Sequence, residues 1–134
     1  KNIIIRTHLI IDDGCNFSGD VHFILEQGKT IHIQKGCLFG MNVYLRTFDG
    51  HPIYDERGVR INSGKDIDIA QHVWVGQQVA IHRASIGKGS MIGMRSFVNK
   101  DFGENCMIVG TPAKVIRQGI HWQYNDNLPY NYGE

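Results

Sequence analysis

Long apolar runs and an excess of either charge are both missing from the sequence. None of its apolar runs approaches the ~18 residues that a membrane-spanning helix requires, so the sequence predicts no helix that spans a bilayer. Fourteen basic and thirteen acidic residues leave a formal net charge of +1, which gives no electrostatic footprint for nucleic acid. Apolar residues make up 42% of the 134 residues and charged residues 20%, so a disordered chain is also excluded. The length predicts one folded domain.

Paired cysteine motifs and a leader sequence are missing as well. The cysteines Cys15, Cys37 and Cys106 make an odd count, and none has the CxxC spacing of zinc or redox sites. Free thiols fit a reducing compartment, so we expect a cytoplasmic protein. No basic segment followed by a cleavage site is visible, which predicts no signal peptide. The first residue is Lys1 rather than Met, as in a processed product or a part of a longer protein.

What the sequence does contain is a six-residue repeat. From residue 69 an aliphatic residue recurs every six positions, with one spacing of five, and a small or branched residue follows most of them four places on. These aliphatic residues are Ile69, Val75, Ile81, Ile86, Ile92 and Val98. The same phase runs upstream through Ile11, Phe17, Phe23, Ile33, Phe39 and Leu45, and downstream through Phe102 and Ile108.

A period of six predicts a solenoid. It matches neither the 3.6-residue period of an amphipathic helix nor the alternation and regular turns of a hairpin meander. Three hexads would close one triangular coil with the aliphatic residues inside, and each coil would bury its face against the next. Glycine follows the aliphatic residue at Gly76, Gly87 and Gly93, where we expect it to relieve an unusual φ angle at the corner.

Two segments depart from the repeat. Residues 48–66 lack the hexad phase and are rich in Gly, Pro, Asp and Arg, which predicts a long excursion loop of functional importance. Residues 112–122 begin with a proline and show helical spacing, which predicts a short capping helix. The expected organisation is therefore a solenoid domain over 1–111 and a C-terminal helix and tail over 112–134. We expect the tail at 124–134 to fray or to pack on a neighbour.

The repeat, together with DGHPIYD at 49–55 and VGTPAKVIR at 109–117, resembles the hexapeptide-repeat acyltransferases. The resemblance covers residues ~9 to ~122 by the repeat phase. It implies a left-handed parallel β-helix, and the two segments are similar to those of the branch that acetylates sugars, including the maltose, galactoside, capsule and O-antigen enzymes. It further implies direct O- or N-acetylation of a sugar or polysaccharide precursor from acetyl-CoA without a metal, in a homotrimer whose active sites lie between subunits.

The resemblance makes His51 the general base that takes a proton from the acceptor. Histidine suits this role because its pKa lies near working pH. An ordinary exposed loop histidine is the alternative. Asp49 or Asp55 could orient its ring, although turn formation explains an aspartate in such a loop equally well. Tyr54 is assigned with these aspartates to acceptor binding. Because buried cysteines are usually inert, a cysteine nucleophile is disfavoured.

Coenzyme A needs a slot for its pantetheine arm and cations for its phosphates. Trp74 falls at an outward position and predicts either a wall of the acetyl-CoA or acceptor slot or a subunit contact. Gly76 and Gly93 would let the arm approach the backbone, although corner geometry alone would also explain them. Lys100, Lys114 and Arg117 are the phosphate candidates, the last two on one face of the predicted helix, with a solvated basic face as the alternative.

Two other functions remain to be weighed on the same fold. A γ-type carbonic anhydrase would need three zinc-ligating histidines, two of them five residues apart, and no histidine pair in the sequence has that spacing. A non-catalytic hexapeptide-repeat domain that trimerises a larger protein is the remaining alternative. The presence of His51 in its loop favours the enzyme.

Overall fold

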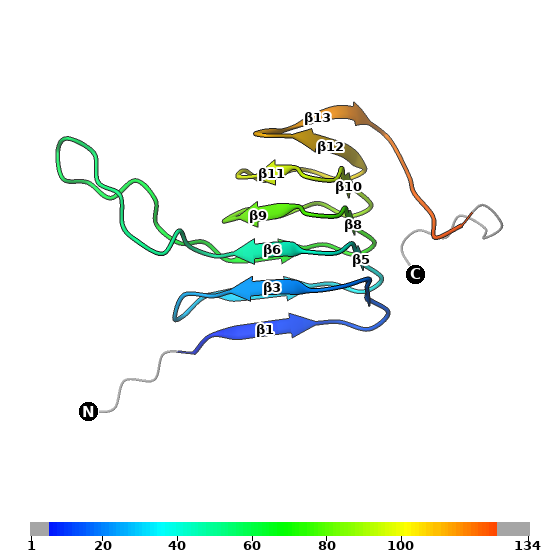
Figure 1. Cartoon of the computed structure of the whole chain (residues 1–134), viewed down its shortest axis with the longest axis horizontal. Coiled ribbons are helices and arrows are strands. Elements are labelled where there is room, and N and C mark those ends of the chain that lie inside the picture. The colour runs from blue at the N-terminus through cyan, green and yellow to red at the C-terminus, as the bar shows by residue number, and fades with distance from the viewer. Residues whose placement is uncertain (1–5, 126–134) are drawn as a thin grey trace.

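A computed structural model describes residues 6–125 as a stack of coils built from short strands (Figure 1). Our expectations for residues 1–5 and for the tail beyond residue 125 lie outside this range. The strands are β1 (His8–Ile11), β2 (Asn16–Phe17), β3 (Val21–Ile24), β4 (Thr30–Ile33), β5 (Leu38–Phe39), β6 (Val43–Arg46), β7 (Ile67–Ile69), β8 (Trp74–Val75), β9 (Ala80–His82), β10 (Met91–Ile92), β11 (Phe97–Val98), β12 (Cys106–Gly110) and β13 (Ala113–Gln118).

The strands form three sheets, one on each side of a triangular coil. Their orders are β1-β4-β7, β13-β12-β10-β8-β5-β2 and β11-β9-β6-β3. Each of the strands β1 to β6 pairs in parallel with the strand three places later, so the chain advances by one coil for every three strands up to β9. Beyond β7 the first sheet continues as isolated parallel bridges at Ile86 and Phe102. The fold is the left-handed parallel β-helix that the hexad repeat and its family resemblance predict.

The repeat correctly predicts the core. Ten of the fourteen predicted hexad residues point into the narrow interior and are at most 2% exposed, whereas Phe23 and Phe102 are only partly buried against this core. The ten buried residues are Ile33, Phe39, Leu45, Ile69, Val75, Ile81, Ile86, Ile92, Val98 and Ile108. The small residues four places on are also buried, and two of them are serines whose hydroxyls donate to carbonyls, Ser90 to Gly103 and Ser96 to Gly93. Polar groups are therefore tolerated inside because each finds a partner.

The first coil does not bury its hexad residues. Ile11 and Phe17 are 42% and 38% exposed, although the repeat phase places both inside. This coil has a neighbouring coil on one side only in the described structure, so its apolar side chains lack half of their cover. Phe17 still stacks on Phe39 of the next coil, with ring centroids 5.0 Å apart.

The glycines after the aliphatic residues serve a different purpose from the one predicted. Gly76, Gly87 and Gly93 do not adopt positive φ, and the left-handed corner conformation falls instead on residues such as His72 and Gln78. A Cβ on Gly76 would lie 2.7 Å from the carbonyl oxygen of Ile92 on the next coil. Glycine is required there because the backbones of stacked coils approach too closely for a side chain.

The predicted capping helix over 112–122 is wrong. Ala113–Gln118 forms strand β13, which folds back and pairs antiparallel with β12. The parallel stack ends at β12, whose outer edge would otherwise expose unpaired N–H and C=O groups. β13 satisfies that edge, and its β-branched Val115 and Ile116 suit a strand. Among residues 6–125, no helix is long and apolar enough to cross a membrane.

Candidate active site

The predicted excursion loop is present and is organised as a hairpin. β6 ends at Arg46 and β7 begins at Ile67, and the chain between them projects from one side of the stack (Figure 1). An antiparallel bridge joins Tyr54 to Arg60 across the hairpin. The Asp55 carboxylate accepts hydrogen bonds from the backbone N–H groups of Arg57 (2.8 Å) and Val59 (3.0 Å). The Asp55 carboxylate therefore stabilises the turn at the tip of the hairpin, which is the turn-forming role expected of an aspartate in such a loop.

Asn62 holds the base of this loop in place. Its side chain is buried, and its Nδ2 donates to the carbonyl oxygen of His51 (2.8 Å) and to Oδ2 of Asp49 (3.0 Å). Its Oδ1 accepts from the backbone N–H of Ile53 (2.7 Å). Nothing in the repeat marks Asn62, so its role could not be predicted from the sequence. The buried amide fixes the backbone at His51 and Ile53 and also holds the side chain of Asp49.

His51 itself is exposed. Gly50, at φ +93°, lets the chain turn sharply into it. Within residues 6–125, no carboxylate lies within 4.0 Å of its ring, so neither Asp49 nor Asp55 is placed to orient it in a single chain. Tyr54 is also exposed, farther along the hairpin. The loop thus presents His51 on a fixed backbone with a free imidazole.

Asp49 turns towards a basic corner at the end of β6 and β9. Its carboxylate lies 3.9 Å from Nδ1 of His82 and 3.6 Å from Nη2 of Arg83. Burial and the positive charge of Arg46 lower the pKa of His82; Asp49 opposes that shift and Arg83 adds to it. His82 is therefore neutral near pH 7. The sequence does hint at this corner, because Arg46 and His82 follow inward aliphatic residues at the same phase of the repeat.

An apolar groove lies on the sheet that contains β5, β8 and β10. It encloses about 510 Å³, and Trp74, Gly76, Gly93, Met41, Met91 and Met94 are among its lining residues. The Trp74 side chain faces outward on β8, between Leu38 of β5 and Met91 of β10. The structure therefore brings together three predicted residues, Trp74, Gly76 and Gly93. Gly76 and Gly93 also have the packing role described above, so their presence alone does not mark a ligand.

The cations of β13 stand at the end of the same sheet. Arg117 lies opposite Met107, which continues the outward column of Trp74 and Met91. Lys114 lies opposite Val109. Two residues three apart on a regular strand face opposite sides of the sheet. The pairing of β12 with β13 contains a bulge between Met107 and Ile108, which shifts the register by one residue. As a result, the side chains of Lys114 and Arg117 both lie on the outward face. The shared face predicted for a helix thus arises from a bulged strand.

Lys100 belongs to another corner. Its ammonium group lies 5.4 Å from the centroid of the Phe102 ring, a cation–π contact. It is not among the residues that line the groove. Lys114 and Arg117 do not line the groove either, but they lie on a strand of the groove's sheet, whereas Lys100 does not.

The segment after β13 covers part of the groove's sheet. Trp122 stacks on His72 with centroids 4.0 Å apart, and its indole N–H donates to the carbonyl oxygen of His72 (3.0 Å). Its ring also lies 6.0 Å from that of Trp74. Tyr124 donates to the carbonyl oxygen of Gly36 (3.3 Å). Trp122, from the predicted helix, and Tyr124, from the predicted tail, thus both pack on their own solenoid, contacts that the repeat does not signal.

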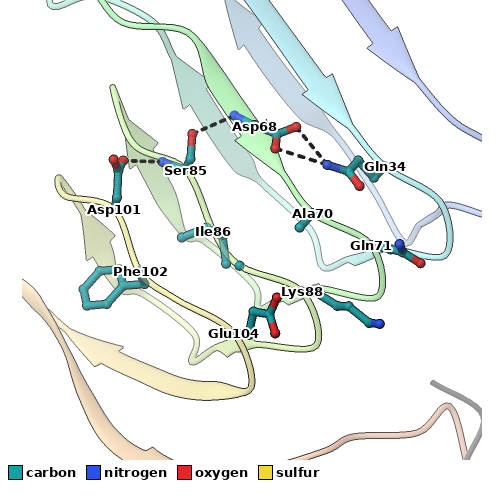
Figure 2. Close-up of a pocket in the computed structure, with 11 residues that line it drawn as sticks. Gln34, Asp68, Ala70, Gln71, Ser85, Ile86, Lys88, Asp101, Phe102 and Glu104 are labelled. Atoms are coloured by element: carbon teal, nitrogen blue, oxygen red, sulfur yellow. Dashed lines mark hydrogen bonds between the residues drawn. The ribbon is translucent and has the colours of Figure 1, made fainter. Parts of the chain in front are cut away.

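Another hollow, of about 390 Å³, lies on the sheet of β4 and β7 (Figure 2). Its polar groups bond to one another across coils, as Figure 2 shows. Gln34 donates to Asp68, the backbone N–H of Asp68 donates to Ser85, and the backbone N–H of Ser85 donates to Asp101. These bonds hold the coils in register. No group of three or more His, Cys, Asp and Glu residues that could hold a metal ion occurs in the part of the chain that the structure describes.

The loop and the groove do not meet within one chain. The loop that carries His51 leaves one side of the stack, and β5, β8 and β10 lie on the opposite side (Figure 1). A site that uses both would need two copies of the chain.

The chain is similar to known acetyltransferases in sequence and in fold. No family model matches the chain. A polysialic acid O-acetyltransferase of Escherichia coli O1:K1 / APEC is 44% identical over 98 residues, which cover 72% of this chain and 32% of the relative. A galactoside O-acetyltransferase of Escherichia coli strain K12 is 34% identical over 109 residues, which cover 78% and 52%. The chain thus spans about half of these curated relatives, or less.

Solved structures of acetyltransferases also resemble this chain. The crystal structure of the polySia-specific acetyltransferase NeuO superimposes with a TM-score of 0.82 and 36% identity, covering 92% of this chain and 54% of that one. A hexapeptide-repeat acetyltransferase of Vibrio cholerae O1 biovar eltor, solved in complex with acetyl coenzyme A, gives a TM-score of 0.54 and 26% identity, covering 76% and 71%.

Proposed function

The chain belongs to the hexapeptide-repeat acyltransferases with a left-handed β-helix, and from that premise we propose that it transfers an acetyl group from acetyl-CoA to a sugar. The acceptor group is a hydroxyl or an amine of a polysaccharide, capsule or O-antigen precursor. The observation that carries the proposal is the shared coil, because 92% of the chain superimposes on a solved polysaccharide acetyltransferase at 36% identity. An acidic polysaccharide is the favoured acceptor, since polysialic acid is what that relative is named for.

His51 acts as the general base in this proposal. Its imidazole takes the proton of the acceptor hydroxyl or amine, and the oxygen or nitrogen attacks the thioester carbonyl of acetyl-CoA. A backbone N–H group stabilises the oxyanion of the tetrahedral intermediate. The intermediate then collapses, the carbon–sulfur bond breaks, and coenzyme A leaves as the thiol or thiolate. The exposure of His51 and its anchored backbone support this role. Asp49 and Tyr54 lie in the same loop and are assigned to positioning the acceptor.

The acetyl group passes directly between the two substrates. Burial disfavours two of the three cysteines as nucleophiles, because it raises the pKa of the Cys37 thiol to about 12 and also encloses Cys106. Cys15 is half-buried, and its thiol donates to the carbonyl oxygen of Gln34 (3.2 Å). The mechanism needs no metal. Free cysteines and the use of acetyl-CoA both fit a cytoplasmic location, which stays a prediction.

Acetyl-CoA is assigned to the apolar groove. Its pantetheine arm would lie along Trp74, Gly76 and Gly93, where the groove offers apolar cover. Its phosphates would meet Lys114 and Arg117, which stand on the outward face at the end of the same sheet. We leave Lys100 out of this set, because its ammonium group lies over Phe102 instead.

The active site is proposed to form between subunits of a homotrimer. The groove of one subunit would receive acetyl-CoA, and the loop of its neighbour would bring His51 to the thioester. The opposite placement of loop and groove in one chain supports this arrangement (Figure 1).

The purified chain should release coenzyme A from acetyl-CoA only when a suitable acceptor is added. A thiol-trapping assay with oligosialic acid, galactosides and amino sugars would measure this and would separate O- from N-acetylation. A trimer that binds acetyl-CoA yet shows no acceptor-dependent release across this panel would contradict the proposal. Such a result would favour the non-catalytic trimerisation domain.

A further inference from the structure

Two arginines meet at the base of the loop, on neighbouring coils. Arg46 ends β6 and lies opposite His82, which ends β9, and Arg83 follows directly. The backbone N–H of Arg83 donates to the carbonyl oxygen of Arg46 (2.8 Å). Both guanidinium groups therefore stand at one corner of the solenoid, where the loop leaves it.

These arginines are unevenly partnered. Nη2 of Arg83 lies 3.6 Å from the Asp49 carboxylate, and its Nη1 donates to the carbonyl oxygen of Ser63 (3.5 Å). Arg46 is half-buried, and among residues 6–125 no carboxylate lies within 4.0 Å of its guanidinium group. The Nε atoms of both arginines are buried without a hydrogen-bond partner. A guanidinium group that is partly removed from water without a counter-ion raises the free energy of the folded state.

The charges of this corner do not cancel. Arg46 and Arg83 bring two positive charges, and Asp49 brings one negative charge. His82 is neutral near pH 7 because its burial and the two arginines together outweigh the opposing effect of Asp49. One positive charge is therefore left over, and its bearer is Arg46.

Arg46 points at the backbone next to the proposed base. Its Nη2 lies 3.5 Å from the position that a Cβ would take on Gly50, the residue before His51. An anion held by this guanidinium group would therefore lie beside the segment that carries His51.

We propose that Arg46, supported by Arg83, binds the carboxylate of an acidic acceptor sugar and so places that sugar next to His51. The inference rests on the proposed function and deepens it, because it selects sugar acids over neutral sugars. Arginine suits the task, since its planar fork matches a carboxylate with two parallel hydrogen bonds. A sugar acid has its carboxylate and its hydroxyl groups on one ring, so a carboxylate held at Arg46 restricts where the reacting hydroxyl can lie.

The test compares an acid with its ester. Acetyl transfer is measured to oligosialic acid and to the same oligomer with its carboxylates converted to methyl esters. Arg46→Gln should lower the ratio of kcat/KM on the acid to kcat/KM on the ester by about 10- to 100-fold, the range for losing a charge-assisted hydrogen bond. Arg46→Lys should recover only part of this ratio, because a lysine keeps the charge without the fork. Lys35→Gln, which removes an equal charge at an exposed corner between β4 and β5, outside the loop, is the control and should keep the wild-type ratio.

Four results would overturn the inference. The acid and the ester could lose activity equally in Arg46→Gln, or neither could lose any. The KM for acetyl-CoA could rise instead, which would assign Arg46 to a coenzyme A phosphate. The variant could lose its oligomeric state in light scattering, which would assign Arg46 to a carboxylate of a neighbouring subunit.

A binding measurement separates this inference from the proposed function. If the wild-type protein acetylates neither oligomer, the proposed function fails, and calorimetry with oligosialic acid alone still tests Arg46. Binding by the wild type that weakens about tenfold or more in Arg46→Gln, as expected for a charge-assisted contact, would support the inference. Equal binding by both proteins, or binding by neither, would overturn it.

Discussion

At the scale of single residues, His51 and His82 lie near the same loop in opposite surroundings. His51 is exposed, and its carbonyl oxygen is held by Asn62. His82 is half-buried beside Arg46, Asp49 and Arg83. Burial and the two arginines lower its pKa against the opposing effect of Asp49 and so keep it neutral. An exposed imidazole on a fixed backbone can reach a substrate, whereas an enclosed neutral one mainly stabilises the corner on which the loop rests.

Replacing His51 should therefore remove catalysis and spare cofactor binding. We expect His51→Ala to lower kcat by ~10²–10⁴, the range for losing a general base, with little change in the affinity for acetyl-CoA. Steady-state kinetics and calorimetry measure the two quantities. His8→Ala, which removes an exposed histidine on β1, is the matched control and should behave as wild type. Wild-type turnover in His51→Ala would refute the assignment and direct attention to His82 or His72.

His82 should make stability depend on pH. The folded state depresses its pKa below the value of about 6.5 that it has when unfolded, so in mildly acidic solution the unfolded chain binds this proton more readily. The contribution of His82 is therefore complete above about pH 6.5 and is lost as the pH falls towards the folded pKa. Between about pH 7.5 and about pH 5.5, the free energy of unfolding measured with urea should fall less in His82→Gln than in wild type. Equal falls in the two proteins would show that His82 is not the group responsible.

At the scale of elements, strand β13 determines where the cations Lys114 and Arg117 lie relative to the groove. The bulge beside Met107 places Lys114 and Arg117 on one face, which a regular strand would not do. Both side chains are exposed, and the column of Met107, Met91 and Trp74 leads from Arg117 to the groove. A single strand thus closes the edge of the sheet and supplies two cations beyond the end of an apolar slot.

Replacing both cations of β13 should weaken acetyl-CoA binding. We expect the Lys114→Ala/Arg117→Ala double variant to raise the KM for acetyl-CoA severalfold or more, because each phosphate contact contributes on the order of 1–3 kcal/mol. The KM for the acceptor should hardly change, since the loop holds the acceptor. Added salt should partly mimic the substitutions in wild type by screening the contacts. Lys35→Ala/Arg6→Ala removes the same charge from exposed positions outside the loop and the groove and serves as the control. Unchanged affinity in calorimetry would identify Lys114 and Arg117 as a solvated face.

At the scale of the whole molecule, the two parts of the proposed site lie apart in one chain. The His51 loop and the groove lie on opposite sides of the stack (Figure 1). The loop also exposes Ile53, Tyr54, Val59 and Ile61, each at least 50% accessible, and such side chains are expected to find cover in an assembly. Both features are satisfied if the loop of one copy packs on the groove face of the next.

The protein should accordingly be a homotrimer in solution, and its activity should depend on that state. Light scattering coupled to size-exclusion chromatography measures the mass, and the activity of each fraction can be assayed. We expect activity in the trimer fraction and none in a dissociated monomer, because a monomer cannot bring His51 to its own groove. A fully active monomer would contradict the interfacial site.

The sequence alone determined the coil and its core. The hexad spacing specifies which residues face inward, and the structure buries Ile33, Phe39, Ile81 and Ile92 as the spacing requires. It also located the loop that carries His51, because residues 48–66 interrupt the repeat. These features could be read from the chain because inward and outward positions follow from the local spacing of neighbouring residues.

Only the tertiary structure decided what the coils bring together. The antiparallel partner of β12, the bulge that aligns Lys114 with Arg117, and the meeting of Arg46 with Arg83 all depend on contacts between coils. The C-terminal segment had helical spacing, yet the open edge of β12 made it a strand, since edge hydrogen bonds outweigh local propensity. Trp122 likewise finds His72 only because both lie on one face of the finished stack. Such contacts join residues far apart in the chain, so the six-residue period determines the coil, and the stacking of coils determines which side chains meet.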